Sequence, residues 1–256
     1  MTARTLTLSV VSHGQANLVA KFLDDLRRLA PPSVAQVLLT INLPEEVPST
    51  ENLPFPVEVL INPRSLGFAA NHNQAFRYVK TDHFAVVNPD IRLKRDPFGS
   101  LLSHLEEDDV GVISPVVLEP NGLVADFARV LITPWESVKR RIHHQPSTRG
   151  LARYDWLAGM FMAFRTETYL SLGGFDERYT LYCEDVDICA RIRLSGKRVV
   201  IAREVEVVHH AQRASHYSLR PLRLHTKSLL KLWTSPAYRE YRKLIAREAM
   251  LATGDE

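Results

Sequence analysis

Cysteine is scarce in this chain of 256 residues, which contains only Cys183 and Cys189. The two lie in one short segment without C-x-x-C spacing, so neither a disulfide framework nor a zinc site is indicated. Long hydrophobic runs are missing as well: no apolar stretch could span a bilayer, and no apolar segment follows a cationic start. We therefore expect a reduced, cytoplasmic protein whose only membrane contact is peripheral.

Common nucleotide fingerprints are also absent. Neither G-x-G-x-x-G nor G-x-x-x-x-G-K-[ST] occurs, so the usual dinucleotide and P-loop motifs cannot define a site. Cations outside the C-terminal segment are mixed with acids instead of interleaved with aromatic residues, which argues against a nucleic-acid partner. The hydrophobic content of 45% is enough for the core of an α/β protein. The net charge of +3 permits small anionic partners such as nucleotides.

The first half of the chain alternates strand-like and helix-like patterns, as a mostly parallel sheet requires. The strand-like stretches are "TLTLSVVS", "AQVLLTINL", "VEVLIN" and "HFAVV", and the helix-like ones are "NLVAKFLDDLRRLA" and "FAANHNQAFRYV". Later, "EDVDICARIRLSG" predicts a helix that stops at Gly196, and "KRVVIAREVEVVHH" predicts a strand. The sequence therefore predicts an α/β fold with a mostly parallel central sheet.

The strand "HFAVV" runs directly into Asn88, Pro89 and Asp90. A central strand must end there, because Pro89 has no backbone N–H to donate. Ligands of open α/β sheets collect at such strand ends. The oxygens of Asn88 and Asp90 would suit Mg²⁺ or Mn²⁺ bridging a diphosphate. The alternative is an Asx-type turn with no ligand.

The predicted helix "EDVDICARIRLSG" has an acid at the head of its apolar face. Asp185 is followed by apolar residues three, four and seven positions later, which places its carboxylate on the inward face. A partly desolvated carboxylate there could act as a general base. Alternatively, Glu184, Asp185 and Asp187 are acids favoured in a first helical turn by the backbone dipole. Asp187 and Arg191 are expected as an i, i+4 pair on an exposed face.

Two further features lie near predicted strand or helix ends. His209 and His210 follow a β-branched strand, and one neutral imidazole could complete a metal shell with Asp90; the alternative is an ordinary structural histidine. In "NPRSLGFAANHNQA", Gly67 permits close backbone approach, and the following helix offers N–H groups to an anion. Otherwise this segment is a simple loop and helix start.

The order of these pieces resembles glycosyltransferase family 2, inverting enzymes of the GT-A fold, and within it the bacterial rhamnosyltransferase-like members. The matching elements are "NPRSLGFAANHNQA", "VVNPDIRL", "YDWLAGMFMAFRTETYLSLGGFDERYTLYCEDVDICARI", "VEVVHH" and "HTKSLLKLW". The resemblance implies one GT-A domain. Residues 1–105 would form its nucleotide-sugar-binding half, residues 106–216 its acceptor and catalytic half, and residues 217–256 a basic amphipathic helical tail.

The resemblance also implies roles for single residues. It makes Asp185 the catalytic base with Glu184 beside it, and it implies a Mg²⁺ or Mn²⁺ site. The implied metal ligands are Asp90, Asn88 and His209, with His210 as an alternative to His209. The implied donor-binding residues are His13, Asn62, Gly67, Asn73, Asn88 and Asp90, and the implied acceptor or sugar contacts are Asp155, Trp156 and Gly159.

Three positions depart from the family pattern. Asn88 replaces an acid in the metal motif, His13 and Gly14 stand where relatives often have Tyr-Asn, and Asn42 stands where an acidic nucleotide contact is common. The Q-x-x-R-W motif of processive synthases is absent, which favours a single transfer. A non-catalytic nucleotide-sugar-binding or scaffold protein of the same fold is the alternative.

The implied reaction moves a hexose onto a hydroxyl of a saccharide or lipid-linked saccharide during cell-surface polysaccharide or lipopolysaccharide synthesis. L-Rhamnose from dTDP-L-rhamnose is the favoured donor, and a UDP-sugar is the other candidate. Asp185 would remove the acceptor proton as the oxygen attacks the anomeric carbon, with inversion.

The tail suits an acceptor at the inner face of the cytoplasmic membrane. Arg220, Arg223, Lys227 and Lys231 occur there with no acid between them, interleaved with leucines. Each cation close to an anionic lipid surface would contribute roughly 1 kcal/mol. The alternatives are a solvated helix packed on the domain and a homodimer contact.

Overall fold

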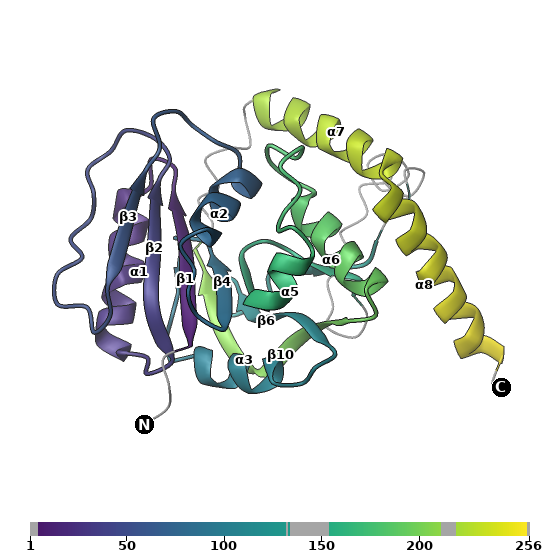
Figure 1. Ribbon diagram of the computed structural model, residues 1–256, viewed down its shortest axis with the longest axis horizontal. Helices are drawn as coiled ribbons and strands as arrows, with labels where there is room; N and C mark the ends of the chain where they lie inside the picture. Colours follow the sequence, from purple (N-terminus) through teal and green to yellow (C-terminus); the bar gives the residue numbers. More distant parts are fainter. Residues whose placement is uncertain (1–4, 132, 134–153, 211–218, 255–256) are drawn as a thin grey trace.

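The computed structural model describes residues 5–131, 133, 154–210 and 219–254. Its centre is an eight-stranded sheet of order β3-β2-β1-β4-β9-β6-β10-β5 (Figure 1). The strands are β1 Leu6–Ser12, β2 Val34–Ile41, β3 Val57–Ile61, β4 His83–Val87, β5 Ile91–Arg92, β6 Val110–Leu118, β9 Phe161–Arg165 and β10 Arg198–His209. A separate short sheet pairs β7 (Ala128–Arg129) with β8 (Trp156–Leu157).

Parallel pairing dominates this sheet, as predicted. Strands β1 to β4 run parallel, and so do β6 and β10. Strand β9 is antiparallel to both β4 and β6, and so joins the two parallel groups into one sheet. The predicted halves of the domain therefore contribute strands to the same sheet.

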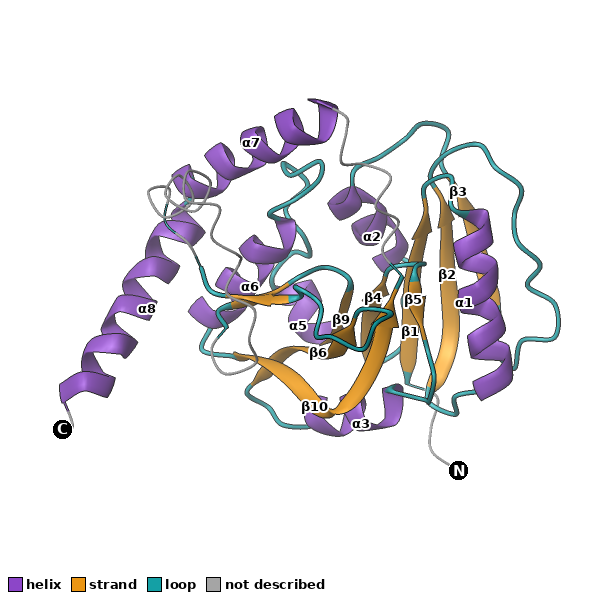
Figure 2. Ribbon diagram, turned by 180° about the vertical axis from the view of Figure 1, so that it is seen from behind, coloured by secondary structure: helices purple, strands orange, loops and turns teal. Residues whose placement is uncertain are grey.

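Helices cover both faces of the sheet, with α1 on the side opposite to α2 (Figures 1 and 2). The helices are α1 Ala16–Leu29, α2 Phe68–Phe76, α3 Phe98–Leu105, α5 Thr166–Ser171, α6 Glu184–Leu194, α7 Leu219–Thr234 and α8 Pro236–Gly254. The predicted stop after α6 is confirmed, because Gly196 follows the helix with φ of +82°, a conformation that glycine adopts without strain. None of the described helices is long and apolar enough to cross a bilayer.

The central strand β1 is buried on both faces, so its few polar side chains need partners inside the protein. Thr7 Oγ1 lies 2.7 Å from Thr81 Oγ1, and Ser9 Oγ lies 2.8 Å from Nδ1 of His72 on α2. Burial lowers the pKa of His72 to about 3, so this imidazole is neutral near pH 7. The Ser9 contact thus anchors α2 on the sheet without burying a charge.

The tail consists of two helices, of which α8 packs against α6 and α7 lies against the segment before α6 (Figure 1). Tyr179, Cys183 and Val186 form one small hydrophobic cluster with Leu232 and Tyr238 of the tail. Polar contacts reinforce it: the Ser228 hydroxyl donates to the Leu181 carbonyl at 2.8 Å, and the Tyr241 hydroxyl donates to the Asp155 carbonyl at 2.6 Å. The tail is therefore packed on the domain, one of the alternatives that the sequence left open.

This packing overturns one prediction. Asp187 and Arg191 do form the expected i, i+4 ion pair, at 2.7 Å, but Asp187 is only 2% exposed. Arg191 also donates to the carbonyls of Leu172 and Gly174, at 2.7 and 2.9 Å. The predicted exposed face of α6 is wrong because the turn at Gly174 covers it. Desolvation raises the pKa of Asp187, and the charge of Arg191 opposes that rise.

We expect Gly67→Ala to destabilise the fold. A Cβ at Gly67 would lie 2.4 Å from the backbone oxygen of Thr180, which also accepts the N–H of Phe68 at 3.0 Å. Backbone cannot move aside as a flexible side chain can, so the cost should be about 1–3 kcal/mol. Urea denaturation would measure it. Gly99→Ala on α3 is the matched control, because nothing lies within 4 Å of its added Cβ. Equal stability of the two variants would contradict the close approach.

Candidate active site

The carboxyl ends of β1, β2, β3 and β4 lie along one edge of the sheet, and each is followed by a polar residue: His13, Asn42, Asn62 and Asn88. The pairing continues slightly past the strands, since the N–H of Asn42 donates to the Ser12 carbonyl at 2.9 Å and that of Asn62 to the Ile41 carbonyl at 3.0 Å. This edge is where an open α/β sheet binds its ligands.

Amide side chains are linked to one another behind this edge. Asn62 Nδ2 donates to Asn42 Oδ1 at 2.9 Å and to Asn71 Oδ1 at 2.6 Å, and its own Oδ1 accepts from Gln74 at 3.0 Å. Asn42 Nδ2 lies 2.8 Å from Nδ1 of His13, whose side chain is exposed. Asn62 is therefore buried and bonded to Asn42, which in turn contacts His13, and its predicted donor contact stays a prediction.

Asn73 is another residue with a predicted role in donor binding. Its Nδ2 donates to the Phe175 carbonyl at 2.8 Å and to Glu177 Oε1 at 3.0 Å. Its Oδ1 accepts from the Tyr169 hydroxyl at 2.7 Å and from the Phe175 N–H at 3.0 Å. With every donor and acceptor of the amide engaged, Asn73 joins α2 to the turn before α6. Gly67 approaches the Thr180 backbone closely, and the first N–H of α2 donates to the Thr180 carbonyl. The donor contacts of Asn73 and Gly67 stay predictions.

Two of the three predicted metal residues, Asp90 and His209, come together. Asp90 Oδ2 lies 3.1 Å from Nε2 of His209, and both side chains are 13% exposed. His210 takes a different position: its N–H donates to the Asp90 carbonyl at 2.9 Å, and its side chain is exposed. Of the two histidines, His209 therefore faces Asp90. The Asn88 carbonyl accepts the N–H of Ile91 at 3.2 Å, so the motif forms a turn that presents Asp90.

The pair fits a divalent cation. Asp90 Oδ1 is buried with no hydrogen-bond partner in the described structure, so this oxygen has a lone pair available for a ligand. A carboxylate with a neutral imidazole suits Mn²⁺, and Mg²⁺ in such sites is typically held by one or two carboxylates together with substrate phosphates. In the parts of the chain that the structure describes, no three His, Cys, Asp or Glu side chains gather around one point.

Asp185 lies in the first turn of α6 and is held by two peptide groups. Its Oδ2 accepts the N–H of Gly159 at 3.1 Å, and its Oδ1 accepts the N–H of Val186 at 2.9 Å. Burial raises the pKa of Asp185, while these N–H groups and the positive charge of Arg129 oppose the rise. Asp185 is half-buried as a residue, and its carboxylate is desolvated, which suits a group that accepts a proton.

Glu184 has a different environment from its neighbour. Its side chain is 4% exposed, and Oε2 has no hydrogen-bond partner among the described residues. Burial, together with the adjacent charge of Asp185, raises the pKa of Glu184 well above its usual range. Two adjacent carboxyl groups with different environments can hold different protonation states at one pH. Here Asp185 is the group suited to accept a proton.

The backbone before α6 is unusual. Tyr182 and Cys183 have φ angles of +70° and +71°, in the left-handed region that non-glycine residues rarely adopt. Such conformations cost of order 1–3 kcal/mol each and persist where the surroundings enforce them. Cys183 is buried in the cluster with the tail helices. The tail therefore helps to hold the turn that presents Glu184 and Asp185.

The predicted acceptor residues lie on and beside β8. Asp155 Oδ2 accepts the N–H of Leu131 at 2.6 Å, so this carboxylate ties two segments together. Trp156 has the guanidinium of Arg129 over its ring, 5.1 Å from the centroid, and packs against the tail cluster. Gly159 donates to Asp185, as described above, and its missing side chain leaves room for Phe68, which would lie 3.0 Å from an added Cβ.

Arg129 is the residue that sequence analysis missed. It bridges to Asp126 at 2.9 Å, stacks on Trp156, and acts electrostatically on Asp185. Its segment has no clear periodicity in the sequence. Only the pairing of β7 with β8, which sets Arg129 opposite Trp156, reveals its place.

The fold defines the class of protein, because it is the GT-A fold. Residues 45–224 match the sequence model of the family described as "Glycosyltransferase like family 2", and the chain therefore belongs to that family. The sequence-based expectation for both family and fold is confirmed.

Two curated relatives with similar sequences are named as rhamnosyltransferases. The chain is 24% identical over 242 residues to rhamnosyltransferase WbbL of Escherichia coli (strain K12), covering 87% of this chain and 90% of WbbL. It is 29% identical over 147 residues to N-acetylglucosaminyl-diphospho-decaprenol L-rhamnosyltransferase of Mycobacterium tuberculosis, covering 50% of this chain and 47% of that enzyme. The chain thus spans nearly all of the first relative but about half the length of the second.

Solved structures share the fold. GalNAc-T7 with UDP, GalNAc and Mn²⁺ superposes with a TM-score of 0.68 at 16% identity, over 94% of this chain and 49% of that one. Mannosyltransferase PcManGT from Pyrobaculum calidifontis, in complex with GDP-Man and Mn²⁺, superposes with a TM-score of 0.60 at 16% identity. The match covers 99% of this chain and 80% of that one.

We expect Glu184→Gln to change how stability depends on pH. Because burial raises the pKa of Glu184, the folded state binds this proton more tightly than the unfolded state does. The resulting stabilisation is complete below the unfolded pKa of about 4.3 and disappears as pH rises through the folded pKa. Gln cannot ionise, so the variant should lose less stability between pH 5 and pH 8.5 than the wild type. Urea midpoints would measure this.

Glu167→Gln is the control for this change. Glu167 is exposed in the first turn of α5, so its variant should keep the pH dependence of the wild type. If Glu184→Gln also kept the wild-type dependence of stability on pH, ionisation of the buried Glu184 carboxyl would not destabilise the folded state.

Proposed function

We propose that this protein is an inverting glycosyltransferase that moves a hexose from a nucleoside-diphosphate donor to an acceptor hydroxyl. One observation carries the proposal: Gly159 and Met160 join the two functional groups. The Gly159 N–H binds Asp185, and the Met160 carbonyl accepts the N–H of Asn88 at 2.9 Å. The proposed base and the candidate metal motif are thus each bonded to the backbone of one of two consecutive residues, Gly159 and Met160.

In the proposed reaction, Asp185 accepts the proton of the acceptor hydroxyl while that oxygen attacks the anomeric carbon. The bond from the anomeric carbon to the diphosphate breaks, the nucleoside diphosphate leaves with the electron pair, and the configuration inverts. A Mg²⁺ or Mn²⁺ ion held by Asp90 and His209, with the Asn88 amide as a further oxygen ligand, would offset the charge of the diphosphate. His13, exposed at the end of β1, lies at the edge proposed for the donor.

The relatives guide the choice of substrates. Both curated relatives compared above are named rhamnosyltransferases, and one is named for an N-acetylglucosaminyl-diphospho-decaprenol acceptor. We therefore favour dTDP-L-rhamnose over a UDP-sugar as donor, and a lipid-diphosphate-linked saccharide as acceptor, in cell-surface polysaccharide or lipopolysaccharide synthesis. The division into a donor half, residues 1–105, and an acceptor half, residues 106–216, belongs to the same proposal.

A lipid-linked acceptor would place the protein at the inner face of the cytoplasmic membrane. On α7, Ser228 and Leu232 are buried against the domain, whereas Lys227 is exposed and Leu230 is 57% exposed. On α8, Met250 is 72% exposed. Outward-facing cations and apolar side chains on one packed tail support peripheral membrane contact. A homodimer contact through the same surface is the alternative.

A non-catalytic nucleotide-sugar-binding or scaffold protein is the second candidate, and the amide of Asn88 in place of a carboxylate favours it. The half-buried carboxylate of Asp185, held by two N–H groups, favours the transferase. A scaffold would bind the donor but transfer no sugar, so a change of Asp185 would have no activity to reduce.

The nucleotide site can be tested by thermal shift. We expect one of dTDP, UDP and GDP to raise the melting temperature in the presence of Mn²⁺, since a ligand at a hundredfold its Kd stabilises the native state by about 2.7 kcal/mol. Asp90→Asn should abolish this metal-dependent rise. Asp82→Asn is the control, because Asp82 is exposed at the opposite end of the same strand.

Each outcome is decisive for one part of the proposal. If no nucleotide stabilises the protein with or without metal, the donor site does not exist and the transferase proposal fails. If Asp90→Asn keeps the full metal-dependent rise, Asp90 is not a metal ligand.

A further inference from the structure

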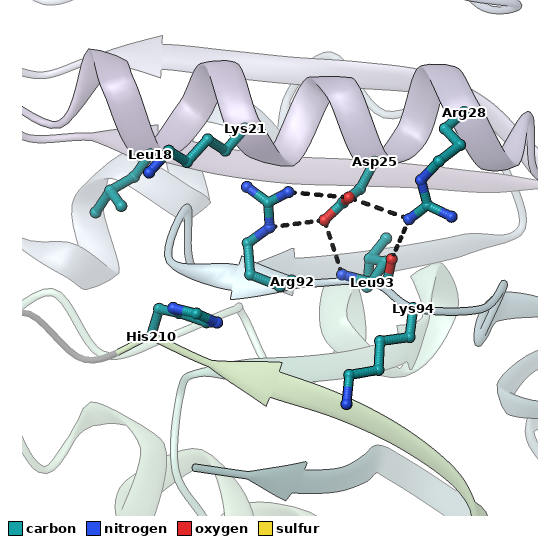
Figure 3. Close-up of a pocket in the computed structure, with 8 residues that line it drawn as sticks. All are labelled: Leu18, Lys21, Asp25, Arg28, Arg92, Leu93, Lys94 and His210. Carbon is teal, nitrogen blue, oxygen red and sulfur yellow. Dashed lines mark hydrogen bonds and ion pairs between the residues drawn. The ribbon is translucent and has the colours of Figure 1, made fainter. Parts of the chain in front are cut away.

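A pocket of about 670 Å³ lies between α1 and β5, and the proposed reaction uses none of its side chains (Figure 3). Lys21 and Arg28 line it from α1, and Arg92 and Lys94 line it from β5 and the segment after it; the Lys94 side chain points away from Asp25. Asp25 is its single acid. Four permanent positive charges therefore surround one negative charge, and the exposed imidazole of His210 adds further donor capacity.

Asp25 organises the two arginines. Its side chain is 8% exposed and sits 2.8 Å from Nε of Arg92 and 3.1 Å from Nη2 of Arg28. It also accepts the N–H of Leu93 at 2.9 Å, while Arg28 Nη2 donates to the Leu93 carbonyl at 2.6 Å. One buried carboxylate thus fixes two guanidinium groups in place, which leaves their remaining N–H donors pre-organised.

The two lysines supply charge that nothing in the pocket neutralises. Within the described part of the chain, neither Lys21 nor Lys94 takes part in an ion pair, and both are exposed. An excess of three positive charges matches a phosphate or diphosphate group better than a single carboxylate. Leu18 also lines the pocket and offers an apolar surface to an organic group carried by that phosphate.

The pocket is built on the same strand ends as the Asp90 and His209 pair. Arg92 lies two residues after Asp90, and its register partner on β10 is Val208. His210 follows His209 directly, and its N–H donates to the Asp90 carbonyl. An anion bound at Arg92 and His210 would therefore contact residues of the paired strands β5 and β10, which lie beside Asp90 and His209.

We propose that the pocket between α1 and β5 is a second anion site, distinct from the donor site, that binds the phosphate or diphosphate group of a phosphoester. Such a group can come from a soluble phosphorylated metabolite or from a lipid headgroup. The charge-assisted bonds would come from the lysines and arginines, and Asp25 acts as the residue that positions the arginines.

The test uses the double variant Lys21→Gln/Lys94→Gln, which leaves Asp25 and both arginines untouched. Titration calorimetry with inorganic pyrophosphate, without divalent metal and at fixed ionic strength, should give saturable binding to the wild type. We expect the double variant to bind at least about tenfold more weakly, because two charge-assisted contacts are lost. Arg77→Gln/Lys80→Gln, two exposed cations after α2 that make the same change in net charge, should bind like the wild type.

Asp90→Asn separates this site from the donor site. It should bind pyrophosphate like the wild type if the anion lies between α1 and β5, whatever becomes of the proposed transferase activity. Loss of binding in Asp90→Asn, equal affinity of the lysine variant and the wild type, or no saturable binding to the wild type would each overturn the proposal.

Two further arms identify the source of the phosphate. Glycerol 3-phosphate probes a soluble ligand, and vesicles of phosphatidylcholine with phosphatidylglycerol probe a lipid headgroup, with pure phosphatidylcholine vesicles as the reference. Binding to either probe that depends on Lys21 and Lys94 supports the site and names its source.

Discussion

The hydrogen bond from the Gly159 N–H to Asp185 is the interaction on which the rest of the site depends. The next residue, Met160, accepts the N–H of Asn88 through its carbonyl. Backbone bonds from two consecutive residues therefore link the carboxylate of α6 to the turn that follows β4. Gly159 lies against the Phe68 ring, so the same segment is also held by α2. Loss of these bonds would free the proposed base to move relative to the proposed metal residues.

Burial then gives the acids around α6 different properties. Glu184 and Asp187 are both buried, and Asp187 forms an ion pair with Arg191. Asp185 keeps partial access to solvent and receives two N–H groups, so its charged form is supported where its neighbour's is not. The tail matters for this arrangement because Cys183, held in a left-handed conformation just before α6, packs against Leu232 and Tyr238.

Sequence analysis succeeded where a local pattern determines the outcome. Pro89 ends β4 because it has no N–H, and Gly196 follows α6 with a positive φ, so both element ends could be anticipated. Asp90 and His209 each follow or end a strand, which is why they could be expected near each other. It failed where the outcome depends on partners distant in the chain. Asn73 forms hydrogen bonds with Tyr169 and Phe175, roughly a hundred positions away. Asp187 is buried, and its partner Arg191 donates to the Gly174 carbonyl. Arg129 gave no signal, because only its strand partner brings it to Trp156.

The most direct test measures sugar transfer by Asp185→Asn, with nucleotide binding measured on the same preparation. The account predicts that the variant binds the nucleotide and Mn²⁺ as the wild type does, while single-turnover transfer from dTDP-L-rhamnose to a lipid-diphosphate-linked N-acetylglucosamine falls by about 10²–10⁴, the usual contribution of a general base. Transfer at the wild-type rate with binding intact would contradict the assignment of Asp185 as the base.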